Sequence, residues 1–348
     1  MSNASRWYAT REAVKAAVGI TGGKADALID SYIETASEAL EKLLSGRRFI
    51  PQTETRYYPW PQKAGKSTVL YLDQDLLAVT TLQAKAQDAS PTTIAAADYF
   101  LEPVNEPPYR RIEIDLSSSA AFEAGDTSQR SISVLGRWAY SEATKAAGAL
   151  AEADDGTETA LNVTDSSLID VGDTILIGTE AMFVSARAQL TTGTTLNDTL
   201  AASQSDVTVT LASGAAAKQG EVLLLDSEKM LVEAISGNDL TVQRGYDGSV
   251  LAAHSSGITV YAPRTLTVVR AVNGTSAATH ADAAAILKYA PPADIVNYVQ
   301  GLAILSHKQA SSGWTGQIGG PEGAVQVRPF DIAKLEEKII ANYRLVTF

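Results

Sequence analysis

Apolar residues recur at three- and four-residue steps in parts of the chain, which is the spacing of one face of an α-helix. The strongest stripe lies between residues 24 and 45 and consists of Leu28, Ile29, Tyr32, Ile33, Ala36, Leu40 and Leu43. Gly46 follows this stripe, and prolines at positions 51, 59 and 61 prevent the helix from resuming. A shorter helix is predicted upstream, where Thr10 can serve as the N-cap and Gly19 as the stop.

Two further helices are predicted near the C-terminus. Asp294 can cap a helix over residues 295–308, whose buried side carries Val296, Val299, Leu302, Ala303 and Leu305. A glycine-rich loop, SSGWTGQIGGPEGA, comes next. The closing segment, residues 329–348, has its own apolar stripe, formed by Ile332, Leu335, Ile339 and Tyr343.

Between residues 54 and 140 the pattern changes to short β-strands. Segments such as STVLYLD, ADYFLEP and RRIEIDL are separated by clusters of Pro, Gly, Asn and Ser. These segments predict a small antiparallel sheet or sandwich. Together with the flanking helices they give the predicted fold class, which is an α+β protein with a helical body and a small antiparallel sheet.

From residue 156 to residue 291 the chain is predicted to be all-β. Asp247-Gly248 and Asn273-Gly274 are dipeptides typical of tight hairpin turns. The preceding stretch, residues 143–156, is small, polar and unpatterned, so it is predicted to be a linker in which Asp154 and Asp155 are solvated. The chain therefore divides into a body, residues 1–145 with 290–348, and an all-β insertion, residues 146–289.

Two motifs recur inside the insertion at two different spacings. GDTILIGTEAMFV from Gly172 recurs as GEVLLLDSEKMLV with an offset of 48, and LTVQRGYDGSVLAAH from Leu240 recurs as LTVVRAVNGTSAATH with an offset of 26. A tandem duplication gives one offset, whereas a module inserted into a hairpin of a related module gives two. We therefore predict an inner module, residues 206–261, nested in an outer module, residues 159–187 plus 265–289. The copies share Glu180/Glu228, Met182/Met230, Arg270/Arg244 and His280/His254, which disfavours a chance similarity between Val/Thr-rich strands.

The composition restricts the functions that the protein can have. At 348 residues the chain exceeds one typical domain, and 45% of it is hydrophobic. The absence of cysteine excludes disulfides and thiolate metal sites. A formal net charge of −12 argues against a general nucleic-acid or anionic-membrane binder. No apolar run approaches the roughly 20 residues needed to span a bilayer, and the N-terminus lacks a signal-peptide core, so a cytoplasmic origin is expected.

The sequence gives little support for an enzyme. WPQKAGKS ends like a phosphate-binding loop, but Trp60 stands where the first glycine is required and a strand follows where a helix is needed. His254 and His280 are expected to be turn residues bonded to backbone rather than metal ligands. No Gly-x-Ser-x-Gly motif is present. No catalytic residue, metal site or cofactor is therefore predicted.

In the body, the order of the segments resembles the head-to-tail adaptor (connector) family of long-tailed bacteriophages. The resemblance rests on SGRRF, TETRYYP, LYLD…LLAVTTL, ADYFLEPVNEPPYRRIEI and ISVLGRWAY, and on PADIVNYVQGLAILSH…LEEKIIANYRLVTF at the C-terminus. It covers residues 5–142 and 290–348. The insertion departs from the family's pattern and resembles small β modules of other phage virion proteins.

The resemblance implies a structural role in the neck of a virion that is assembled in the host cytoplasm. Family members form a homo-oligomeric ring, usually a dodecamer, beneath the portal protein. Their C-terminal arm docks on the portal, and the opposite face receives a tail-side connector or tail-completion protein. DNA passes through the channel without specific binding, which an acidic chain favours. The portal interface expected here consists of Ile332, Leu335, Ile339, Tyr343, Arg344 and Phe348.

Alternatives remain open at several of these residues. Arg47 and Arg48 follow a helix C-terminus, where they complement exposed carbonyls or form a salt bridge between subunits, and contact with phosphates of DNA in the channel is a less favoured third alternative. Trp314 is either an interface residue or part of a mobile surface loop. The apolar C-terminal stripe contacts either the portal or its own body. The alternative function is a tail or baseplate subunit whose β modules bind host-surface carbohydrate.

Overall fold

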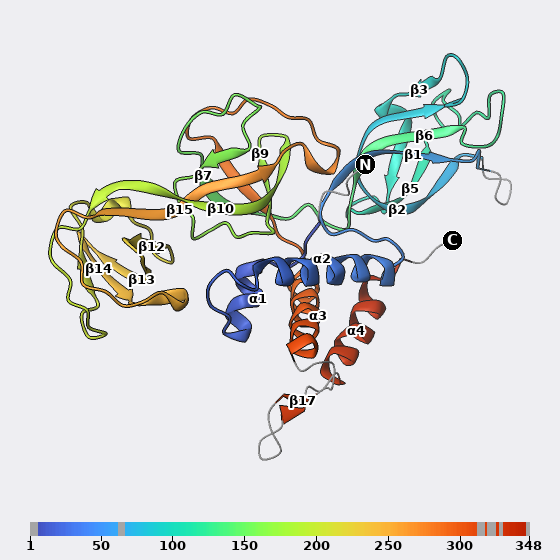
Figure 1. Ribbon diagram of the computed structural model, residues 1–348. Helices are drawn as coiled ribbons and strands as arrows, with labels where there is room; N and C mark the ends of the chain where they lie inside the picture. Colours follow the sequence, from blue (N-terminus) through green and yellow to red (C-terminus); the bar gives the residue numbers. More distant parts are fainter. Residues whose placement is uncertain (1–5, 62–66, 312–316, 319–324, 327–329, 346–348) are drawn as a thin grey trace.

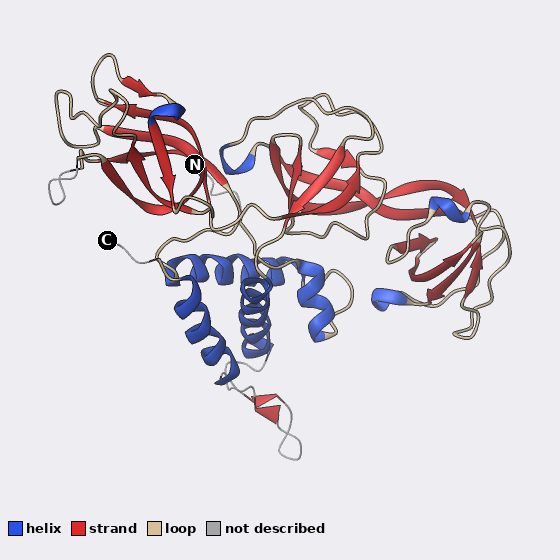
Figure 2. Ribbon diagram, turned by 180° about the vertical axis from the view of Figure 1, so that it is seen from behind, coloured by secondary structure: helices blue, strands red, loops and turns tan. Residues whose placement is uncertain are grey.

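The computed structural model describes residues 6–61, 67–311, 317–318, 325–326 and 330–345. Figure 1 shows a helical unit at the centre, with a β-sheet lobe above it on one side. On the other side the insertion extends as two β units that are joined by a long two-stranded ribbon. Figure 2 shows the same division from behind, with the four α-helices gathered below the two large sheets.

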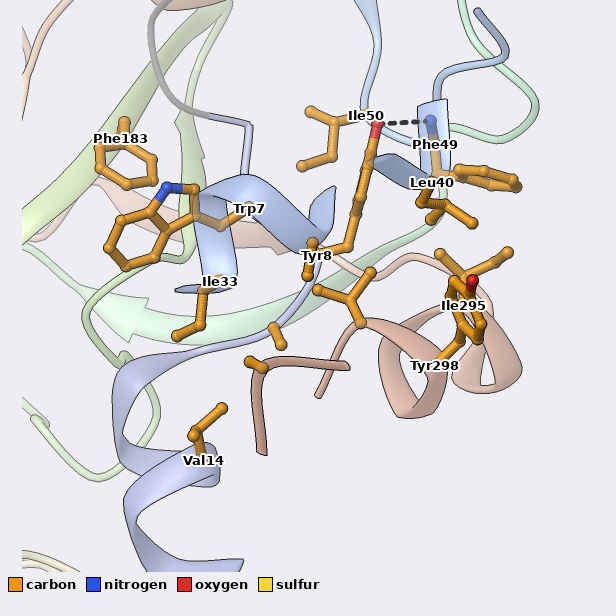
Figure 3. Packing of buried hydrophobic residues seen from close by; sticks show 14 of the residues in the cluster. Trp7, Tyr8, Val14, Ile33, Leu40, Phe49, Ile50, Phe183, Ile295 and Tyr298 are labelled. Atoms are coloured by element: carbon orange, nitrogen blue, oxygen red, sulfur yellow. Dashed lines mark hydrogen bonds between the residues drawn. The ribbon is translucent and has the colours of Figure 1, made fainter. Parts of the chain in front are cut away.

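The helical unit is built from four helices in the described residues: α1 (Arg11–Val18), α2 (Asp26–Leu43), α3 (Ala293–Ser311) and α4 (Phe330–Tyr343). The predicted N-cap of α1 is confirmed, because Thr10 Oγ1 accepts a hydrogen bond from Ala13 N at 3.3 Å. α2 lies across the upper ends of α3 and α4 (Figure 1). Their shared core contains Ile33 and Leu40 of α2 and Ile295 of α3 (Figure 3). Ile339 of α4 belongs to the same core, and all four side chains are fully buried.

The six-stranded antiparallel sheet has its own hydrophobic core. Its strands are β1 (Gln52–Tyr58), β2 (Val69–Ala84), β3 (Thr92–Ile94), β4 (Tyr99–Glu102), β5 (Tyr109–Ile114) and β6 (Ile132–Trp138). Their order is β1-β6-β2-β5-β4, with β3 paired to β2. The long strand β2 pairs with β5 near its start and with β6 in its second half, so it belongs to both halves of the sheet. Leu76, Ile112, Val134 and Trp138 are among the buried residues of this core.

The insertion forms a ten-stranded antiparallel sheet. Its strands are β7 (Thr144–Ala149), β8 (Ala160–Asn162), β9 (Thr174–Ile177), β10 (Glu180–Thr195), β11 (Thr208–Thr210), β12 (Val222–Leu225), β13 (Glu228–Ser236), β14 (Asp239–Gln243), β15 (Thr259–Val269) and β16 (Ala285–Tyr289). The order is β11-β14-β13-β12-β15-β10-β9-β16-β7, with β8 on β15. A separate short pair joins β17 (Gln317–Ile318) to β18 (Val325–Gln326).

The predicted fold class is wrong. The protein is mostly β, with 37% strand against 22% helix, and it contains two large antiparallel sheets rather than a helical body with a small one. The helices are few, but each has a clear apolar stripe that stands out in the sequence. Apart from β2, the strands of the first sheet have seven residues or fewer, and their assembly around Trp138 and Leu76 produces a second core. The sequence pattern therefore overstated the helical share.

The predicted linker over residues 143–156 is also wrong in part. Residues 144–149 form β7, which pairs with β16 through Thr144↔Tyr289, and Ala147 and Leu150 are buried. Small side chains let this strand pack closely, and composition alone does not distinguish such a strand from a linker. Ala290 N donates to Ala143 O at 2.8 Å, so the two ends of the insertion lie side by side.

The two copies of each repeated motif have the same local structure. The β9–β10 hairpin closes with Ile177↔Glu180, and the β12–β13 hairpin closes with Leu225↔Glu228. Gly172 N donates to Val184 O at 2.9 Å, and the equivalent bond from Gly220 to Val232 measures 2.8 Å. These matching contacts support a nested duplication. The outer core also includes residues of β7, and the inner core includes Leu196 and Leu200, so we use outer module for residues 144–188 with 265–289 and inner module for residues 194–262.

The two modules are attached to the body in different ways. Val171, Ala181, Phe183 and Val272 of the outer module belong to the same hydrophobic core as the helices. Trp7 packs edge-on against Phe183 with ring centroids 5.3 Å apart (Figure 3). The core of the inner module, among the described residues, is formed by that module alone. The outer module is thus joined to the body by apolar packing, whereas the inner module is not.

Candidate functional site

The C-terminal helix α4 packs its apolar stripe against the helical unit of its own chain. Ile339 is fully buried, and Ile332, Leu335 and Tyr343 are partly buried against the same core. Leu345, just beyond the helix, is buried as well. Of the two interpretations of this stripe, the described residues adopt the one in which it packs on the body.

Arg47 holds the end of α4 in place. Its Nη1 donates to Tyr343 O at 2.7 Å, and its Nη2 lies 3.1 Å from Asp75 Oδ1. The guanidinium also lies over the ring of Tyr140, 4.5 Å from the centroid. A cation at a helix C-terminus complements carbonyls that have no partner within the helix. Arg47 performs this role for α4, which is far from it in the sequence, rather than for α2.

Asp75 forms ion pairs with two arginines, Arg47 and Arg110. It is 1% exposed, and Arg110 Nε lies 2.8 Å from its Oδ1, beside the contact with Arg47. Burial lowers the pKa of Arg110, the charge of Asp75 raises it, and the nearby Arg47 lowers it. Arg47 therefore joins β2 of the sheet lobe, through its ion pair with Asp75, to the last turn of α4, through its hydrogen bond to Tyr343 O.

Tyr343 is fixed by its hydroxyl as well as by its carbonyl. The hydroxyl donates to Asp294 Oδ1 at 3.0 Å, at the start of α3. Burial, together with this bond to Asp294, raises the pKa of Tyr343 to about 12. Arg344 follows directly, and its side chain is exposed. Among the predicted portal residues described here, Arg344 is therefore the one whose side chain faces solvent most fully.

The remaining predicted interface residues fall into two groups. Arg48 pairs within the chain, with its Nη1 3.1 Å from Glu54 Oε2, so both arginines of the pair are engaged inside one subunit. Trp314 and Phe348 lie outside the described residues.

The inner module contains a buried cluster around Glu228. Arg244 binds both carboxylate oxygens, with Nε–Oε1 2.7 Å and Nη2–Oε2 2.9 Å, and the side chains of both residues are 0% exposed. The backbone N–H groups of Gly245 and Ala252 and the Nε2 of His254 also lie within 3.0 Å of this carboxylate. Burial alone would raise the pKa of Glu228, but the hydrogen bonds, from Arg244 above all, bring it to about 2.

The outer module repeats this cluster around Glu180. Arg270 binds it through Nε at 3.0 Å and Nη2 at 2.7 Å, and His280 Nε2 lies 3.0 Å away. Burial opposes ionisation here too, but the bonds from Arg270 lower the pKa of Glu180. The two clusters differ in the acidic residue that accompanies the glutamate. Asp154 binds Arg270 in the outer module, and Asp226 lies 2.9 Å from His254 Nδ1 in the inner one.

The expectation that His254 and His280 bond backbone through their side chains is wrong. Each imidazole instead contacts the glutamate of its own module. The shared Glu, Arg and His of the repeats carried this information, because residues that recur together in two copies mark positions that touch. Every charged group in these clusters has a partner of opposite charge or a backbone group. The clusters therefore cross-link the hairpins and leave no free acid, base or nucleophile among their members.

Three carboxylates of the outer module lie near one another. Oxygen atoms of Asp154, Asp155 and Glu158 are within 4.8 Å. Asp154 is buried and bound by Arg270, which corrects the prediction that it is solvated. The side chain and N–H of Thr157 bond to Asp155 and lower its pKa. A guanidinium already neutralises part of this group, so it gives no support for a metal site.

No protein-family model, curated protein or solved structure matches this chain. None of the helices in the part of the chain that the structure describes is long and apolar enough to cross a membrane.

Proposed function

We propose that this chain is a structural head-to-tail adaptor of a bacteriophage virion. Copies of the chain form a ring, of the dodecameric kind, beneath the portal protein. The ring surrounds the DNA channel in the neck and joins the capsid to a tail-side connector or tail-completion protein. The protein is a structural component rather than an enzyme and uses no cofactor.

One observation carries this proposal. The two stretches that resemble the adaptor family, residues 5–142 and 290–348, are separated by the whole insertion, yet their helices share one core. Ile33 of α2, Ile295 of α3 and Ile339 of α4 are all fully buried in it. The insertion leaves and returns at adjacent points, where Ala290 bonds to Ala143. A body of this kind is what a ring-forming adaptor with an added surface domain requires.

The contacts that Arg47 makes at the end of α4 support a portal contact through Arg344. Arg47, Asp75 and Tyr343 fix the end of the helix, and Arg344 follows with an exposed side chain. A guanidinium on a rigid support recognises a carboxylate with little loss of conformational entropy. In the proposed contact, Arg344 pairs with a carboxylate of the portal protein, and the buried stripe positions it.

The test uses DNA-filled heads of the parent phage that were assembled without this protein. The purified chain is expected to bind these heads and to restore tail joining, whereas the Arg344→Glu variant binds at least tenfold more weakly. The matched control is Arg130→Glu, which changes the same charge at an exposed position in the sheet lobe. Failure of the unchanged chain to bind heads refutes the proposed function. Equal binding by Arg344→Glu and the control refutes only the assignment of Arg344.

A further inference from the structure

Among the described residues, the inner module contacts the body at the turn Tyr246–Gly248 between β14 and β15, two strands that do not pair with each other, so the hairpin predicted at Asp247-Gly248 is not formed. Asp247 and Gly248 follow β14, and Asp247 Oδ1 accepts a hydrogen bond from the backbone N–H of Gly22 at 2.9 Å. Its other oxygen, Oδ2, binds Lys229 Nζ at 2.6 Å. Gly22 lies in the loop between α1 and α2. Both oxygens of one carboxylate are therefore used, one inside the module and one across to the body.

Gly248 fits this contact only because it lacks a side chain. Its φ of +73° is in the left-handed region, and a Cβ added there would lie 2.8 Å from Thr21 Oγ1. The equivalent turn of the outer module behaves in the same way, since a Cβ on Gly274 would lie 2.0 Å from Thr53 O of β1. Both modules thus place the same kind of turn against the body, at two different elements.

The two contacts differ in what lies beside them. In the outer module, Val272 of the turn enters the shared helical core. In the inner module the described contact with the body is polar. A cavity of about 480 Å³ lies next to it, lined by residues of α1, of the ribbon and of the inner module, including Lys15, Arg187 and Tyr246. In the described residues, none of the buried residues of the inner module's core belongs to the helical core that includes residues of the outer module.

The ribbon that carries the inner module is irregular. β10 and β15 change register between Val184 and Ala186, between Ala188 and Leu190, and between Thr191 and Thr195. Bulges of this kind bend a two-stranded ribbon and interrupt its ladder. A second tie lies at the base of the inner module, where Glu221 binds Arg264 and accepts hydrogen bonds from the N–H and hydroxyl of Ser166. It fixes one end of the module next to the ribbon, which leaves the turn at Asp247 to fix its orientation.

We propose that the contact of Asp247 and Gly248 with the α1–α2 loop is a latch, which holds the inner module against the body and allows it to pivot on the ribbon when it opens. The latch sets the direction in which the insertion projects. It does not depend on the adaptor function, because it rests on contacts within one chain.

The experiment measures a distance between two spin labels in the full-length protein. The chain contains no cysteine, so Ser31→Cys on α2 and Glu233→Cys on β13, both exposed, introduce unique labelling sites. With the latch closed, pulsed electron paramagnetic resonance is expected to give one narrow distance distribution. Asp247→Ala and Gly248→Ala are expected to shift it and broaden it at least twofold.

Two further variants separate the latch from general damage to the module. Gly237→Ala introduces the same left-handed strain at φ +63° in the inner module, but its Cβ faces open space, so the narrow distribution is expected to persist. Thr21→Leu crowds Gly248 from the body side and leaves the module's own residues unchanged, and it is expected to broaden the distribution. Hydrogen exchange of β12 and β13 in this variant should stay as in the unchanged chain. If all variants share one distribution, whether narrow or broad, the latch is refuted.

Discussion

Replacing Arg244 by methionine tests whether the Glu–Arg–His cluster holds the inner module together. Methionine preserves much of the side-chain volume but removes the guanidinium that binds both oxygens of Glu228. Both side chains are 0% exposed, and breaking a buried ion pair from one side costs about 3–5 kcal/mol. Arg244 also bonds the carbonyl oxygens of Ala201, Asp206 and Ala252, which lose their partner at the same time.

The pKa of Glu228 gives a second route to the magnitude. It is lowered from 4.5 to about 2, and a shift of this size corresponds to about 3 kcal/mol of stability. Because the folded-state pKa is depressed, this stability is fully present above pH 4.5 and is lost as the pH falls towards 2. This figure covers all the hydrogen bonds to Glu228, including those from the N–H groups of Gly245 and Ala252, and Arg244 makes the largest favourable contribution.

Hydrogen exchange followed by mass spectrometry resolves the inner module from the rest of the chain. In Arg244→Met, peptides that cover β12, β13 and β14 are expected to lose about 10²- to 10³-fold protection, since each 1.4 kcal/mol is a factor of ten. Arg137→Met, which removes a half-exposed partner of Glu142, serves as the control and should change stability by less than about 1 kcal/mol. Adding Glu228→Met to Arg244→Met should recover part of the protection. Unchanged protection in Arg244→Met would show that the cluster does not stabilise the module.

Two other changes test the remaining contacts. Arg47→Leu frees the carbonyl of Tyr343 and is expected to destabilise the end of α4 by about 2 kcal/mol, seen as faster exchange in α4 but not in α1; equal exchange in both would contradict this role of Arg47. Joining Ala188 to Thr265, which face each other in the β10–β15 register, through an Asn-Gly turn in place of residues 189–264 should leave the body's melting temperature within about 3 °C. Removing residues 146–289 takes away Phe183, uncovers Trp7, and should lower the melting temperature further and shift tryptophan emission to the red; equal melting of the two deletions would refute the shared core.

The sequence predicted those parts of the structure that depend on local spacing. The stripe over residues 24–45 contains α2, and Thr10 caps α1 as expected. The repeated glycines, glutamates and arginines mark equivalent positions of two hairpins because each copy must satisfy the same buried charges. Patterns of this kind are visible because the residues that interact lie close in sequence or occur twice.

Long-range contacts account for what could not be predicted. β7 was predicted to be a linker because its small residues carry no apolar pattern, and Ala147 is buried only in the assembled sheet, where β16, about 140 residues later, lies beside β7. Asp75 and Tyr343 meet at Arg47 from opposite ends of the chain, and no periodicity in the sequence connects them. The sequence could not decide whether the apolar stripe of residues 332–343 packs on the body or on another protein. An apolar stripe shows that one face of a helix is buried, but it does not identify the surface that buries it.

Two-dimensional averages of the purified full-length protein by electron microscopy test the central proposal most directly. A head-to-tail adaptor should give closed rings with a central channel, with the helical unit and sheet lobe in the ring wall and the insertion projecting from it. The version that lacks residues 189–264 should give the same ring with a shorter projection. Monomers, or open filaments without a closed ring, over the concentration range from micromolar to about 100 µM would contradict the proposal.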